Sequence, residues 1–142
     1  LYNIVDAHEQ GYDENLYVDS ATRTYIEETG GANIVFVTGE GKLVVPKSDT
    51  ILPSITRRSL IQVARDYLGL EVEERVVGID ELGNFAEAGL CGTAAVISPV
   101  GTTEAMIAPS ISEAATLWIA NSIFRSMAYS SEVLVTSVRS LA

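Results

Sequence analysis

The chain has 142 residues, of which 47% are hydrophobic and 20% are charged. This composition is ordinary for a globular protein and argues against an intrinsically disordered or membrane-embedded chain. The 9 basic and 19 acidic residues give a net charge of −10, which disfavours nucleic acid and anionic membrane surfaces as partners. We therefore expect one domain over residues 1–142, built around one hydrophobic core.

The sequence contains one cysteine, Cys91, so no internal disulfide can form. A reducing compartment is the expectation from this, and we predict a cytoplasmic location. No uninterrupted apolar run approaches the length of about 18 residues that a membrane-spanning helix needs, and residues 1–10 lack the basic start of a secretory signal. The chain opens on Leu1 without an initiator methionine, which predicts that it is a piece of a longer protein.

The first third of the chain is predicted to be mainly extended. Residues 1–11 have the pattern of a helix end that Gly11 terminates. Residues 15–20 alternate apolar and polar side chains as in a half-buried strand, and residues 24–28 form another short extended piece. The run NIVFVTGEGKLVV predicts a β-hairpin whose two β-branched segments join at residues 39–41.

The segment Ile51–Gly69 carries the clearest helix signals in the sequence. Ser54 can cap the first turn, where the backbone N–H groups of Ile55 and Thr56 are left without helical acceptors. Such a helix start attracts an anion, because free N–H groups and the helix dipole act together. Taken alone, the segment is also consistent with a capped helix that binds no ligand. Gly69 is placed to end the helix.

The rest of the chain alternates between extended and helical patterns. Residues 70–77 predict a charged strand near a sheet edge, residues 80–89 a short amphipathic helix, and residues 90–98 a strand buried on both faces. Residues 112–129 have a helical pattern. For residues 131–142, periodicity leaves both a strand and a second helix open.

Several of these segments resemble one family when they are taken together. The likeness is carried by YIEETGGANIVFV (Tyr25–Val37), SDTILPSITRRSLI (Ser48–Ile61), LEVEERVVGIDEL (Leu70–Leu82) and CGTAAVISPVG (Cys91–Gly101). The four stretches resemble the large domain of the class IV aminotransferases, and most closely that of the branched-chain amino-acid aminotransferases. Four matches in register over roughly a hundred residues make a more specific signal than one short motif.

The resemblance implies a fold and a cofactor. The fold would be an α/β (α+β) domain of fold-type IV, with a mixed sheet or pseudo-barrel and flanking helices. The cofactor would be pyridoxal 5′-phosphate, and no metal ion is expected. Residues 102–142 do not match the usual ending of the family, so they form an atypical tail to which the resemblance assigns no role.

Two residues match family positions at the cofactor ring. Glu28 matches the glutamate that keeps the pyridine nitrogen protonated, and a carboxylate beside a cation favours the charged form of both. Leu52 stands where the family packs an aliphatic side chain on the ring face. Without the resemblance, Glu28 would be read as a cap or strand-end carboxylate, which is our interpretation of its neighbour Glu27.

The remaining matched residues concern the cofactor phosphate and the substrate. Ile55 and Thr56 match phosphate-binding positions, and Thr93 matches a third phosphate contact. Gly92, Thr93 and Ala94 resemble the tight turn whose backbone N–H groups also meet the substrate carboxylate. Taken alone, these small residues would equally suit a crowded strand.

The resemblance also implies a reaction and its limits. The intact enzyme would transfer the amino group of leucine, isoleucine or valine to 2-oxoglutarate, so its partners would be branched-chain amino acids and 2-oxo acids. A homodimer is implied as well. The family's Schiff-base lysine lies upstream of Leu1, and neither Lys42 nor Lys47 stands in a matching motif, so this piece alone is expected to be inactive.

Two alternatives stay open from the sequence. One is another class IV enzyme, such as a D-amino-acid aminotransferase or an aminodeoxychorismate lyase, because the substrate-facing small domain is not in this sequence. The other is a non-catalytic module, a degenerate domain kept for binding or assembly, which the altered tail would suit.

Overall fold

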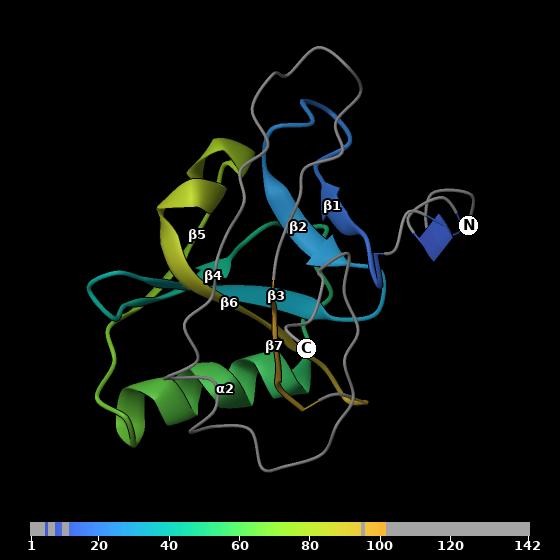
Figure 1. Cartoon of the computed structure of the whole chain (residues 1–142). Helices are drawn as coiled ribbons and strands as arrows, with labels where there is room; N and C mark the ends of the chain where they lie inside the picture. Colours follow the sequence, from blue (N-terminus) through green and yellow to red (C-terminus); the bar gives the residue numbers. More distant parts are fainter. Residues whose placement is uncertain (1–4, 6–7, 10–11, 95, 102–142) are drawn as a thin grey trace.

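A computed structural model describes residues 5, 8–9, 12–94 and 96–101 of the chain. Figure 1 shows helix α2 lying along one face of a twisted sheet. The elements in chain order are β1 (Leu16–Val18), β2 (Ile26–Thr29), β3 (Asn33–Thr38), β4 (Leu43–Pro46), α2 (Ile55–Asp66), β5 (Val72–Arg75), the 3-10 helix η1 (Ile79–Asn84), β6 (Phe85–Cys91) and β7 (Ser98–Pro99).

Strand β3 is the centre of the sheet. It pairs antiparallel with β6 over its whole length, from Asn33 opposite Cys91 to Thr38 opposite Phe85. It also pairs antiparallel with β2 near its start and with β4 near its end. Strand β4 pairs parallel with β5, and β1 and β7 extend the sheet from β2 and β6. The sheet is therefore mixed, as the resemblance implies.

The segment after β5 returns to β2 and closes the strands into a partial barrel. The N–H of Ile26 donates to the carbonyl of Val77 at 2.8 Å, and Tyr25 forms an isolated antiparallel bridge with Gly78. Strands β2, β3, β4 and β5 are thus connected in a ring, which matches the expected pseudo-barrel.

Two hydrophobic clusters fill the space on either side of β3, because successive side chains of a strand point to opposite faces. Ile34 and Phe36 face the barrel interior, where the Phe36 and Phe85 rings stack with centroids 4.5 Å apart. Val35 and Val37 face helix α2. The interior cluster contains Ile26, Ile34, Phe36, Val44, Val77, Leu82, Phe85, Ala88, Leu90 and Val100. The helix-side cluster contains Val35, Val37, Leu43, Val45, Leu60, Ile61, Ala64 and Cys91.

The predicted hairpin and helix are confirmed with their turns and caps. Gly41 adopts a φ of 84° in the β3–β4 turn, a conformation that favours glycine. The side chain of Ser54 accepts a hydrogen bond from the N–H of Arg57 at 3.3 Å and caps helix α2. Gly69 takes a φ of 64° just beyond the end of the helix, as expected of a residue that terminates one.

Two predictions for the segment after β5 are wrong. Residues 80–89 were expected to be helical, but the helix is a 3-10 turn that ends at Asn84, and Phe85–Cys91 form strand β6. The ladder with β3 outweighs the helix propensity of alanine and glutamate in this stretch. Residues 90–98 were expected to be one strand. Instead the chain turns after Cys91 and returns as β7, with Ser98 opposite Leu90.

Other predictions lie outside the described residues. They are the end of a helix at Gly11, the helical pattern over residues 112–129 and the choice between strand and helix over residues 131–142. Within residues 1–11, the described positions 5 and 8–9 are helical.

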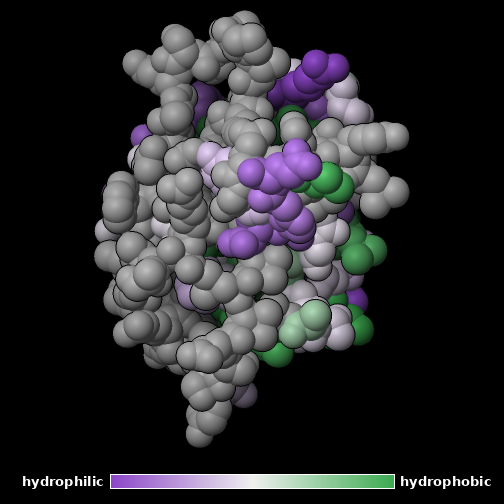
Figure 2. Space-filling view, turned by 45° about the vertical axis from the view of Figure 1, so that its right-hand side comes forward, coloured by the Kyte–Doolittle hydropathy of each residue, from purple (hydrophilic) through white to green (hydrophobic). Residues whose placement is uncertain are grey.

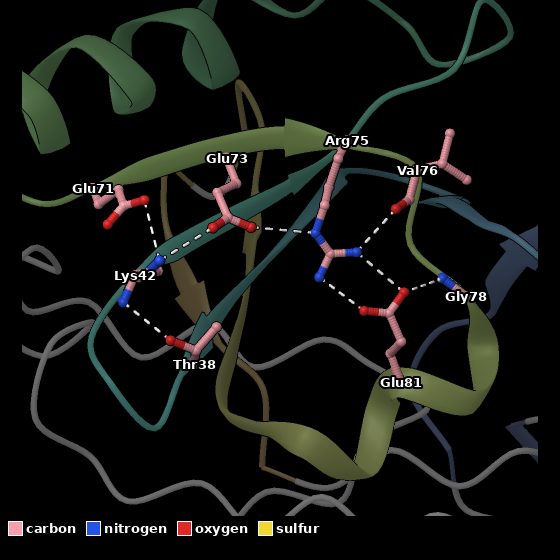
Figure 3. A network of polar contacts seen from close by, with 8 residues as sticks. All are labelled: Thr38, Lys42, Glu71, Glu73, Arg75, Val76, Gly78 and Glu81. Carbon is pink, nitrogen blue, oxygen red and sulfur yellow. Dashed lines mark hydrogen bonds and ion pairs between the residues drawn. The ribbon is translucent and has the colours of Figure 1, made fainter.

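A chain of ion pairs involves the side chains of β5 that point away from helix α2 (Figure 3). The ammonium of Lys42 lies 3.1 Å from Glu71 and 3.4 Å from Glu73, and these hydrogen bonds raise the pKa of Lys42. Glu73 also pairs with Arg75, which in turn lies 2.8 Å from Glu81. The hydrogen bond from Arg75 lowers the pKa of Glu81. The predicted charged strand thus uses its charges to join the β3–β4 turn to η1.

The exposed hydrophobic side chains come from several different elements. On the face drawn in Figure 2, the coloured hydrophobic residues form small areas between hydrophilic ones. Within the described ranges, no helix is long and apolar enough to cross a membrane.

Candidate functional site

Glu28 stands at the corner where β2 turns into β3. Its Oε2 atom accepts a hydrogen bond from the side-chain amide of Asn33 at 3.0 Å and from the backbone N–H of Leu52 at 3.3 Å. Its Oε1 atom has no hydrogen-bond partner in the part of the chain that the structure describes. The predicted residues Glu28 and Leu52 are therefore in direct contact, with one carboxylate oxygen left for a further donor.

Asn33 connects this carboxylate to the loop before helix α2. Its side-chain nitrogen also donates to the carbonyl of Leu52 at 3.3 Å, and the residue is only 4% exposed. Asn33 was not among the site residues predicted from the sequence. An asparagine that opens the β-branched run NIVFV was an available signal, because asparagine is depleted in strands unless its side chain has a specific partner.

A second carboxylate of β2 holds the same loop. Oε1 of Glu27 accepts hydrogen bonds from the hydroxyls of Ser48, at 3.4 Å, and Thr50. The interpretation of Glu27 as a strand-end carboxylate fits its place in β2, but it left out this contact. Residues 48–52 are thus held to β2 by two adjacent glutamates.

The start of helix α2 has the properties of an anion-binding site. The N–H groups of Ile55 and Thr56 have no hydrogen-bond acceptor among the described residues. The first turn contains no acidic residue and includes Arg57. Leu52 is 67% exposed and Ile55 is 74% exposed, so the side chains beside these N–H groups are accessible. A negative group placed here would gain from both the N–H donors and the helix dipole.

The side chain of Arg57 connects the start of helix α2 to strands β4 and β5. Its Nη2 atom donates to the carbonyl of Pro46 at 3.2 Å and to Glu74 at 3.3 Å, while its buried Nε atom has no partner within the described segments. Arg57 also acts on the thiol of Cys91 at the end of β6. Burial raises the pKa of Cys91 to about 11, and the guanidinium of Arg57 opposes that shift. The start of α2 and the end of β6 therefore lie near each other.

The turn that follows β6 lies against the turn that precedes β3. A Cβ atom built on Gly92 would be 3.5 Å from the Cβ of Ala32 and 3.6 Å from the carbonyl oxygen of Gly31. Thr93 and Ala94 are exposed in a bend just after Gly92. Gly92 is therefore beside the β2–β3 corner that carries Glu28.

The structure brings the predicted residues together to different degrees. Glu28 and Leu52 are joined by a hydrogen bond, and Gly92 packs beside residues 31–32. Thr93 makes no hydrogen bond to the helix start within the described ranges, and only its position next to Gly92 brings it to this end of the sheet.

The donors and acceptors suit a ligand with two different ends. An anionic group fits the free N–H groups of Ile55 and Thr56, because both are backbone donors at a helix start. A protonated nitrogen fits the free Oε1 of Glu28. Within the described residues, no group of three or more histidine, cysteine, aspartate or glutamate side chains could hold a metal ion. Pyridoxal phosphate has both required ends, a phosphate and a pyridine nitrogen, so the residues fit it.

The fold and the site define a class of protein. Residues 5–102 match the model of the family described as Amino-transferase class IV. This match covers most of the chain, and the chain belongs to that family.

Relatives that match the chain include branched-chain-amino-acid aminotransferases. The chain is 53% identical to the branched-chain-amino-acid aminotransferase of Helicobacter pylori (strain J99 / ATCC 700824) over 94 residues, which cover 66% of this chain and 28% of that protein. It is 50% identical to the branched-chain-amino-acid aminotransferase of Haemophilus influenzae over 93 residues, which cover 66% of this chain and 27% of that protein. The chain thus spans less than a third of the length of these relatives.

Solved structures agree with this relationship. The branched-chain amino acid aminotransferase from Thermobaculum terrenum in its PLP form matches with a TM-score of 0.64 and 42% identity, over 69% of this chain and 31% of that one. The branched-chain amino acid aminotransferase from Escherichia coli matches with a TM-score of 0.61 and 37% identity, over 68% of this chain and 32% of that one. These matches confirm the predicted fold-type IV domain.

Proposed function

We propose that this chain is the cofactor-binding part of a branched-chain amino-acid aminotransferase that uses pyridoxal phosphate. The observation that carries the proposal is the contact between Glu28 and Leu52, which places a carboxylate with one free oxygen next to the loop that leads into helix α2. The names of the similar enzymes from Helicobacter pylori and Haemophilus influenzae supply the substrate class.

The cofactor would be held at its two ends. Ile55 and Thr56 would bind the phosphate through their N–H groups, with the hydroxyl of Thr93 as a third contact. Glu28 would hold a proton at the pyridine nitrogen through its free Oε1 atom. Pyridoxal phosphate, when bound, supplies the electron-withdrawing ring that amino transfer requires.

The side chain of Leu52 and the turn after β6 would shape the rest of the site. Leu52 is exposed beside the helix start, where it can cover one face of an aromatic ring. Gly92, Thr93 and Ala94 would bind the substrate carboxylate through backbone N–H groups. A substrate amino acid would therefore be fixed at its carboxylate. The enzyme would distinguish branched-chain from other amino acids by their side chains.

Amino transfer in the intact protein tests the reaction. We expect the protein that contains this chain to convert L-leucine, L-isoleucine and L-valine with 2-oxoglutarate as the amino acceptor. Activity with D-alanine, or lysis of aminodeoxychorismate, in place of activity with L-leucine would assign the chain to another class IV enzyme. Tight binding of pyridoxal phosphate without any of these activities would favour a non-catalytic module.

Two further properties belong to this proposal. The intact protein would form a homodimer, which sedimentation equilibrium would test by a mass twice that of one chain. It would act in the cytoplasm, since Cys91 is its only cysteine in this region and lies buried as a free thiol.

A further inference from the structure

We propose that Asn33 is a positioning residue of the cofactor site, which fixes Glu28 and the loop at Leu52 in one arrangement. This role rests on the function proposed above. Asn33 does not need to touch the cofactor, because it acts through the carboxylate and the loop that do.

The amide group of Asn33 is suited to this task. Its nitrogen carries two hydrogens, and it donates to Oε2 of Glu28 at 3.0 Å and to the carbonyl of Leu52 at 3.3 Å. Both acceptors are thereby held by one rigid planar group. The N–H of Leu52 closes the arrangement by donating to the same Oε2 atom at 3.3 Å.

The backbone of Asn33 cannot easily move. It lies opposite Glu28 in the β2–β3 ladder and opposite Cys91 in the β3–β6 ladder. The residue is 4% exposed, so its side chain is held in place by packing as well. A buried amide fixed between two ladders gives its partners a defined position.

The contact with Leu52 extends to the helix start. The carbonyl of Leu52 also accepts the N–H of Ser54 at 2.8 Å, and Ser54 caps helix α2. A continuous path of hydrogen bonds therefore runs from Glu28, through Asn33 and Leu52, to the residue before Ile55. This path links the carboxylate for the ring nitrogen to the N–H groups for the phosphate.

Two substitutions at Asn33 remove the donor in different ways. Asn33→Leu keeps the approximate volume without a donor or a charge, and Asn33→Asp keeps the shape but cannot donate when ionised. Asn84→Leu is the matched control, because Asn84 is exposed at the end of η1. Asn33→Ser is a milder variant for use if the leucine variant does not fold. A serine hydroxyl has one hydrogen, so it can donate to only one of the two acceptors.

The readouts are the affinities of the 142-residue chain for pyridoxal phosphate and for inorganic phosphate, and the visible circular dichroism of the bound cofactor. We expect the Asn33 variants to lose about tenfold or more in affinity for pyridoxal phosphate, as is typical when a supporting contact is removed, and to lose dichroism at saturation. Their affinity for inorganic phosphate should stay within about twofold of the original, because the Ser54 cap and the bond from Arg57 to the carbonyl of Pro46 hold the helix start without Asn33. A merely structural role would weaken both affinities together.

Hydrogen exchange at the Leu52 amide provides a readout without any ligand. The Asn33 variants should exchange this proton faster than the original chain and the Asn84→Leu control. If cofactor affinity, dichroism and Leu52 exchange are unchanged in the folded variants, the positioning role of Asn33 is overturned, but the proposed function is not. An original chain that binds phosphate but shows no preference for pyridoxal phosphate would overturn the proposed function, and this role with it.

Discussion

The carboxylate of Glu28 and the backbone N–H of Leu52 form a hydrogen bond of 3.3 Å, although the two residues are 24 positions apart in the chain. This contact joins the end of β2 to the loop before helix α2. Because the N–H groups of Ile55 and Thr56 follow within the next few residues, one carboxylate and two free backbone donors come to the same end of the sheet.

Glu28 is expected to contribute to cofactor binding through its charge. The substitution Glu28→Gln keeps the shape of the side chain but removes the carboxylate that pairs with a protonated ring nitrogen. A hydrogen bond to a charged group contributes about 1.5–3 kcal/mol, so we expect the affinity for pyridoxal phosphate to fall by about tenfold or more. Equilibrium titration followed by the absorbance of the cofactor measures this change.

Glu27→Gln is the matched control for that experiment. Glu27 is the neighbouring residue in β2, and its carboxylate bonds to the hydroxyls of Ser48 and Thr50. We expect its replacement to change cofactor affinity less than the replacement of Glu28. Equal losses in the two variants would show that the loop, and not the charge at Glu28, determines binding.

The cap of helix α2 is expected to contribute to stability. Ser54→Ala removes the side-chain oxygen that accepts the N–H of Arg57, and loss of such a cap costs about 1 kcal/mol. Urea unfolding should show this loss as a lower midpoint with an unchanged slope. Ser59→Ala, at an exposed position in the middle of the same helix, should leave the midpoint unchanged or raise it slightly.

The thiol of Cys91 is expected to react slowly. Burial raises its pKa from 9.0 to about 11, so the reactive thiolate fraction below pH 9.0 is about a hundredfold smaller than that of an ordinary cysteine. Modification by iodoacetamide, followed by mass spectrometry, should be slow in the native chain and fast in urea. Native and unfolded chains that react at the same rate would contradict the burial of Cys91.

The pair of Arg75 and Glu81 predicts a dependence of stability on pH. The hydrogen bond from Arg75 holds the pKa of Glu81 below its ordinary value of 4.5. A lowered pKa in the folded state stabilises the protein above pH 4.5, and this contribution is lost as the pH falls through the folded value. The side chains are 37% and 33% exposed, so the contribution is about 0.5 kcal/mol after screening by solvent.

Glu81→Gln tests this contribution directly. The variant should unfold at a lower urea concentration than the original chain near neutral pH, and the two curves should converge as the pH falls below 4.5. Glu40→Gln, in the exposed turn between β3 and β4, is the control. A difference that grows on acidification would have the wrong sign for a carboxylate whose pKa is lowered in the folded state.

Local signals in the sequence were sufficient for several elements. The glycines at positions 39 and 41 predict the hairpin, because a turn of this kind requires the positive φ that Gly41 adopts. Ser54 and Gly69 bracket helix α2 for the same kind of local reason. The resemblance to the class IV aminotransferases then gave the fold type, which no local pattern could have supplied.

Nonlocal pairing explains what the sequence did not predict. Residues 85–89 have a composition that favours a helix, and only the ladder with β3 makes them a strand. The sequence identified Glu28 and Leu52 as separate candidates. It could not show that the amide of Asn33 joins them, because that contact exists only after β2, β3 and the loop have come together.

Binding of pyridoxal phosphate between Glu28 and the start of helix α2 is tested most directly by titrating the isotope-labelled chain with the cofactor and following the amide resonances by NMR. We predict that the amides of Leu52, Ile55, Thr56 and Thr93 shift together, with one dissociation constant, and that Glu28→Gln weakens all of these shifts. Shifts that lie elsewhere in the described sheet, or that leave Leu52, Ile55 and Thr56 unchanged, would contradict this prediction.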